Sequence, residues 1–271
     1  MIVQSAPPGA PHFVMTMAQH TAFAGKLAAQ FGNDRFEAVK PRDIVLNVVA
    51  CHDVGWCAFD ARALRNPATG LPYHLVDTPF EHLLETSAAS PDFNEAQHAY
   101  GGLLSSMHSW GLYNGRYGMS DKVLVEGLEG TRRTAADHML AAEEARQQRL
   151  RATLCRDPET AAWLENGQLM QNYKQLQFFD TLALYFHCNH AEGREPASFT
   201  HVPVNRSDAC EVTITPLGDG SYTCSPYPFR EDALALSYEG RYLWPVDEGN
   251  SVREALAAAP IERQQLSLRA A

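Results

Sequence analysis

The sequence lacks the cysteine spacing of a disulfide scaffold or a zinc-binding motif. Its six cysteines are scattered and include no CxxC pair: Cys51, Cys57, Cys155, Cys188, Cys210 and Cys224. A chain of 271 residues with 45% hydrophobic content can bury a core without covalent cross-links. We therefore expect reduced thiols in a cytoplasmic protein.

Long apolar runs and an excess of basic residues are also missing. No apolar stretch reaches the roughly 20 residues of a membrane-spanning helix. Residues 1–8 show no basic region followed by an apolar stretch, so no secretory signal is expected. The formal net charge is -10, and an acidic surface repels phosphate backbones. We expect a small-molecule substrate, and we expect neither nucleic acid nor a membrane as a partner. The sequence is compatible with a homodimer.

Several common catalytic motifs are absent. The sequence has no GxGxxG fingerprint, no GxxxxGK[ST] loop and no GxSxG elbow. Cys51 precedes His52 but lies on an apolar helix face, which favours a core cysteine over a nucleophile. Histidine, in contrast, is abundant, with 11 residues. This count is a first indication of metal chemistry.

Helical periodicity dominates the first two thirds of the chain. Apolar spacing predicts helices over residues 19–31, from Pro41 past His52, over 79–89, from Asn94 to about Trp110, over 134–154, from Pro158, and over about 168–188. Pro91 should stop the third of these. Residues 60–79 and 112–130 are expected to be loops, and the Pro-rich residues 1–12 a strand or arm.

The character of the sequence changes after Gly193. Short alternating runs at 210–214, 221–225, 233–237 and 240–244 predict strands, and Gly218-Asp219-Gly220 predicts a hairpin turn. The expected fold is therefore mainly α, with a helical bundle over residues 1–195. A small β-rich C-terminal extension over residues 196–271 should pack on it.

The strongest local signal is His52-Asp53, within Ala50-Cys51-His52-Asp53-Val54-Gly55-Trp56. Adjacent side chains on a helix point roughly 100° apart, yet both can reach one metal ion in a groove, through nitrogen and through oxygen. A capping or salt-bridge role for the pair is the alternative. Asp180 lies in an otherwise apolar helix and needs a partner or a metal.

His20, His52-Asp53 and Asp180 occur in this order on three predicted helices. In this respect the chain resembles the HD superfamily of metal-dependent phosphohydrolases, and among its members a family of uncharacterised bacterial proteins. The matching stretches are QHTAFAGKLAAQFG, ACHDVGW, LLSSMH, LQFFD and PYPF. The resemblance implies an HD-like helical bundle and a metal centre.

The resemblance to binuclear HD proteins also implies a second ion. Asp53 would bridge two divalent ions, with His20, His52 and Asp180 completing one site and His82 and His108 the other. Iron is the expected metal, with manganese as an alternative. His98 could replace one of the last two histidines. His187, seven residues after Asp180, is either a partner of a ligand or a buried core histidine.

Several HD subfamilies place a basic residue shortly after the HD pair, but this chain has Val54, Gly55 and Trp56 there. Lys26, Arg62, Arg65 or Lys174 could take over that role. Lys174 is our catalytic candidate beside Asp53, although its spacing of six residues from Asp180 does not place both cleanly on one helix face.

Three functions follow from the resemblance. The first is metal-dependent hydrolysis of a small phosphate ester by a metal-activated water, which Asp53 would orient. The second is a mixed-valent di-iron oxygenase that cleaves a C–H, C–C or C–P bond with dioxygen. The third is a non-catalytic binding protein on an HD scaffold.

Overall fold

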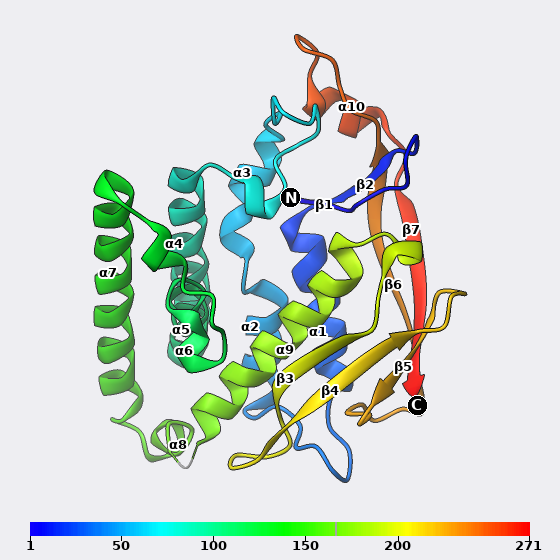
Figure 1. Cartoon of the computed structure of the whole chain (residues 1–271). Helices are drawn as coiled ribbons and strands as arrows, with labels where there is room; N and C mark the ends of the chain where they lie inside the picture. The colour runs from blue at the N-terminus through cyan, green and yellow to red at the C-terminus, as the bar shows by residue number, and fades with distance from the viewer. Residues whose placement is uncertain (166) are drawn as a thin grey trace.

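The computed structural model describes residues 1–165 and 167–271. Its helices pack on one face of a curved sheet (Figure 1), with α1 and α9 next to the strands and α4, α5 and α7 on the far side. The longer helices are α1 (Met17–Gln30), α2 (Arg42–Cys51), α4 (Phe80–Gln97), α5 (Ala99–Tyr113), α7 (Gly130–Leu154) and α9 (Gln168–Cys188).

Short helical segments connect these helices. The α-helical ones are α3 (Cys57–Arg62), α6 (Gly115–Gly118), α8 (Pro158–Ala162) and α10 (Val252–Ala258). The 3-10 turns are η1 (Val54–Trp56), η2 (Leu75–Asp77), η3 (Leu124–Gly127) and η4 (Ala191–Gly193). The predicted helix over 168–188 is confirmed at both ends. The predicted loops contain η2, α6 and η3, and the first of them also includes the end of α3.

The sheet corrects the predicted fold class. Within the described residues it has seven strands in the order β1-β2-β6-β7-β5-β4-β3, and only β5 and β7 pair in parallel. The strands are β1 (Ile2–Val3), β2 (His12–Met15), β3 (Ala197–Pro203), β4 (Ala209–Pro216), β5 (Ser221–Ser225), β6 (Ala233–Leu243) and β7 (Glu262–Ala270). The expectation of a helical bundle with a small C-terminal extension was wrong, because the sheet is substantial and begins at the N-terminus.

One continuous hydrophobic core joins the sheet to the helices. It includes Phe13 and Ile2 from the first strands, Phe23 from α1, Phe186 from α9 and Leu268 from β7. Phe186 packs edge-on against both Phe23 and Tyr222 of β5, with ring centroids 6.1 and 5.0 Å apart. The sheet is thus part of the layer that holds α1 and α9 in place.

Pro91 does not end a helix, contrary to the sequence prediction. Helix α4 continues through Pro91 to Gln97. A proline inside a helix leaves the carbonyl four residues earlier without its N–H partner. Here that carbonyl belongs to Ser87, and the Ser109 hydroxyl of α5 donates to it at 2.8 Å. Packing against α5 therefore supplies the missing hydrogen bond.

The segment Arg42–Arg62 is long and apolar enough to cross a membrane by length and composition alone, which the sequence analysis did not expect. In the structure, α2 ends at Cys51 and packs against α1, α5 and α9. A core helix of a globular protein also has this composition. The N-terminal half of this segment is thus one of the packed helices of a globular fold.

Candidate metal centre

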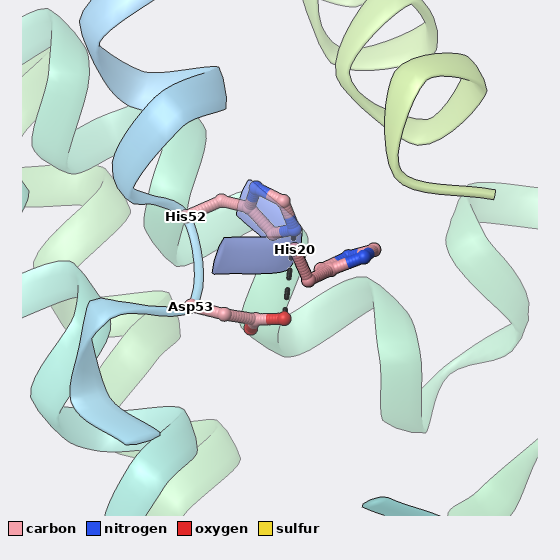
Figure 2. Close-up of side chains that lie close together, drawn as sticks. All are labelled: His20, His52 and Asp53. Atoms are coloured by element: carbon pink, nitrogen blue, oxygen red, sulfur yellow. Dashed lines mark ion pairs between the residues drawn. The ribbon is translucent and has the colours of Figure 1, made fainter. Parts of the chain in front are cut away.

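Five acidic and histidine side chains from four helical regions converge beside the sheet. His20 comes from α1, His52 and Asp53 from the end of α2, His108 from α5 and Asp180 from α9. We call these five residues the His–Asp cluster. Figure 2 shows His20, His52 and Asp53 in close proximity. The sequence predicted all five as ligands, and the structure brings them together.

The ends of two helices set the positions of these side chains. A capping box fixes the start of α1: the Thr16 hydroxyl accepts from the Gln19 backbone, and the Gln19 side chain accepts from the Thr16 backbone. Helix α2 ends at Cys51, and Asp53 leaves the helical conformation with φ -113° and ψ 24°. The side chains of His52 and Asp53 are therefore not held at the angle of roughly 100° that a continuous helix would impose.

Distances between the donor atoms fit one metal ion. His20 Nε2 lies 3.2 Å from Asp180 Oδ1, and His52 Nε2 lies 3.5 Å from Asp53 Oδ2 and 3.6 Å from Asp180 Oδ1. Ligands held about 2.1 Å from a metal are about 3.0–3.5 Å from each other. The cluster forms two overlapping groups that share His52: His20-His52-Asp53 and His52-His108-Asp180, with donor atoms within 4.8 Å of one another in each.

The ring of His52 is oriented as a metal ligand would be. Its Nδ1 lies 2.7 Å from the Val49 carbonyl oxygen, so Nδ1 carries the proton and donates it. Nε2 is buried and has no hydrogen-bond partner among the described residues. It can carry a second proton, or a lone pair that binds a metal ion. A buried nitrogen between two carboxylates is costly unless a proton or a metal ion occupies the space. The donor set therefore fits a divalent metal.

His187 supports His20 from the sheet side of the cluster. His20 Nδ1 and His187 Nδ1 are 3.0 Å apart, so one of them donates to the other. If His20 donates, its Nε2 keeps a lone pair toward Asp180. The His187 ring packs on Tyr238 of β6 and on Phe23, at centroid distances of 4.5 and 4.8 Å. His187 is thus both a buried core residue and the partner of a candidate ligand.

Gln177 contacts Nδ1 of His108, as His187 contacts Nδ1 of His20. Its amide nitrogen lies 2.7 Å from His108 Nδ1, and a turn of the amide by about 180° would place the oxygen there instead. An amide oxygen facing Nδ1–H would leave a lone pair on His108 Nε2, and the assignment of oxygen and nitrogen in an amide follows from such networks. Sequence reasoning missed Gln177. Its spacing of three residues before Asp180 on α9 was the available signal.

The charges of the cluster are strongly coupled. Burial alone would lower the pKa of His52, but Asp53 and Asp180 raise it to about 9. Burial would raise the pKa of Asp180, whereas contacts with His20 and His52 hold it well below its usual range. Burial and the charge of His52 lower the pKa of His108 to about 3. Burial raises the pKa of Asp53, although the charge of His52 opposes this. Without an ion, His52 keeps a proton beside Asp53 and Asp180.

These shifts predict how stability of the metal-free protein depends on pH. The raised pKa of His52 contributes stability fully below pH 6.5, and this contribution is lost as pH rises from 6.5 to about 9. The lowered pKa of His108 removes stability as pH falls below 6.5. Denaturant unfolding of chelator-treated protein should show a maximum near pH 6.5, with a decline of at most about 3 kcal/mol by pH 9.

Added divalent metal should remove the alkaline decline, because the ion takes the place of the proton between the carboxylates. If the metal-free protein were equally stable from about pH 6 to pH 9, the raised pKa of His52 would be wrong.

His82, Lys174 and His98 lie outside the His–Asp cluster. His82 Nδ1 is 3.2 Å from Glu85, and its ring packs on Phe59 with centroids 5.0 Å apart. Lys174 lines a separate cavity along α9. His98 caps α5 by accepting from the Tyr100 backbone N–H. His82, which was predicted as a ligand of a second ion, therefore does not lie at the cluster.

Comparison with known proteins identifies the family but no function. Residues 1–244 match the model of the family described as "Protein of unknown function (DUF3891)", and the chain belongs to this family. No curated protein and no solved structure shows significant similarity to this chain.

Proposed function

We propose that this protein is a metal-dependent hydrolase that acts on a small phosphate ester in the cytoplasm. One divalent ion would be held by the His–Asp cluster. The observation that supports this most is the buried Nε2 of His52, which has no hydrogen-bond partner in the described part of the chain and lies between two carboxylates. The resemblance of the cluster residues to the HD superfamily supports the same reaction class.

A divalent ion in this position would act as a Lewis acid and acidify water. The residues of the cluster differ in what they can contribute. His20 and His52 are fully buried, so they can only hold and orient. The Asp53 side chain is 15% exposed, against 6% for that of Asp180. Asp53 can therefore face water and substrate, orient the attacking water and accept its proton.

Nitrogen and carboxylate donors suit iron, manganese or another borderline divalent ion. Within residues 1–165 and 167–271, both groups of candidate ligands share His52, and none stands apart from it. One ion is the simplest occupant of such an arrangement. A di-iron oxygenase would need a second set of ligands, so hydrolysis is the function that this geometry favours.

The test combines metal analysis with an activity screen. Protein purified without affinity metal should contain about one divalent ion per chain and hydrolyse members of a phosphate-ester panel. Chelation should abolish the activity, and readdition of iron or manganese should restore it. Two irons per chain with a mixed-valent EPR signal would replace the proposal by the oxygenase. A protein that neither contains nor takes up metal would leave only the binding scaffold.

A further inference from the structure

A second feature of the molecule is a cavity of about 280 Å³ along α9, between α6 and β3. Basic and hydroxyl side chains line much of its wall: Arg116, Lys174, Thr181, Ser198, Thr200 and His201. We call it the α9 cavity. None of the described residues that line it is acidic. Its size is near the lower limit of ligand pockets, which suits a small molecule.

The two strong cations of the α9 cavity have no acidic partner in the part of the chain that the structure describes. Among the described residues, no carboxylate lies within 4.0 Å of Arg116 or Lys174, although several other arginines form such pairs. In a chain with a net charge of -10, two unpaired cations beside one cavity concentrate positive potential there. Such a potential attracts an anion.

The backbone is also unusual at this cavity. Arg116 and His201 have φ of 51° and 59°, a left-handed backbone conformation that residues other than glycine rarely adopt. His201 follows Phe199 at a bulge, where β3 has one more residue than β4 between its pairs with Val212 and Cys210. Left-handed residues and bulges are common at binding sites, where they redirect side chains. Here both present basic residues to one cavity.

Gln177 joins the α9 cavity to the His–Asp cluster. It lines the cavity, is only 6% exposed, and contacts His108 Nδ1 with one atom of its amide. The amide oxygen is buried without a hydrogen-bond partner in the described structure. Arg116 also lies near His108: its Cα would be 3.5 Å from a Cβ on Gly111, one turn along α5. A ligand in the cavity would therefore adjoin the cluster.

We propose that the α9 cavity binds an oxyanion, phosphate or carboxylate, that the substrate carries beside the bond that reacts at the His–Asp cluster. This assignment rests on the proposed function for its role in substrate binding. Arg116 and Lys174 supply the charge, and the hydroxyls of Ser198 and Thr200 supply further donors. The Thr181 hydroxyl donates to the Gln177 carbonyl oxygen at 2.7 Å and is not such a donor. His201 lies at the exposed rim.

Binding of inorganic phosphate and of malonate to chelator-treated protein tests the site, because no metal then competes for the anion. Isothermal titration calorimetry would compare the wild type with Arg116→Asn, which tolerates the left-handed backbone, and with Lys174→Gln. The matched control is Arg132→Gln, at an exposed position of α7. Each cavity variant should weaken binding about tenfold, while the control should match the wild type.

Tighter binding of phosphate than of malonate would assign a phosphate group, and the reverse order a carboxylate. The proposal is overturned if neither anion binds saturably, or if the cavity variants bind as the wild type does. Metal content and hydrolysis are measured separately. Anion binding without any metal uptake would thus support the cavity assignment and reject the proposed function. Metal-dependent hydrolysis together with cavity variants that bind anions as the wild type does would support the proposed function and reject the cavity assignment.

Discussion

Replacing His52 by glutamine is expected to weaken metal binding at least about a hundredfold and to abolish metal-dependent hydrolysis. His52 belongs to both groups of candidate ligands, and its Nε2 lies 3.5 and 3.6 Å from the two carboxylates. Glutamine keeps polarity and approximate length but does not provide an imidazole nitrogen. Competitive titration with a chromogenic chelator would measure the change in affinity.

The matched control is His82→Gln. The sequence places both histidines in the metal site, but the structure pairs His82 with Glu85 and leaves its side chain 21% exposed. This variant should bind metal as the wild type does. Circular dichroism must show that His52→Gln is folded. The single-ion assignment would be rejected if His52→Gln retained its metal or if His82→Gln lost an equivalent of it.

Three of the ligand predictions depended on local signals that the fold preserves. His52 and Asp53 are adjacent in the chain, and Asp180 is a carboxylate in a long apolar helix, so its burial required a partner. His108 and His82 were harder to distinguish, because both lie on predicted helices between the HD pair and Asp180. Only tertiary packing decides that His108 of α5 faces the cluster while His82 of α4 contacts Phe59 and Glu85.

The sheet was harder to predict than the helices because its pairings are long-range. Strand β2 pairs with β6, more than two hundred residues later in the chain. Strand β7 has the sequence ERQQLSLRA, in which only Leu266 and Leu268 are buried, so its alternation is weak. No local pattern indicates that Tyr238 of β6 would pack on His187 beside the His–Asp cluster.

Gly55→Ala is the second substitution for which we expect a large effect, a loss of about 3 kcal/mol in the free energy of unfolding. A Cβ atom at Gly55 would lie 2.3 Å from the Thr86 carbonyl oxygen and 2.8 Å from the Ser90 backbone nitrogen. Both atoms belong to the backbone of α4, so no side-chain rotation can relieve the clash. The Gly55 N–H also donates to the Ser90 hydroxyl at 3.0 Å, and that bond would be lost as the segments separate.

The same displacement should reach the His–Asp cluster, because Gly55 follows Asp53 by two residues and η1 moves with it. We therefore expect lower metal affinity together with lower stability, measured by chelator competition and denaturant unfolding. Gly127→Ala is the matched control, since a Cβ there meets nothing within 4 Å. It should leave both quantities unchanged. If Gly55→Ala were as stable as this control, α4 would not pack directly on the turn that carries Asp53, and the position of that carboxylate would need another explanation.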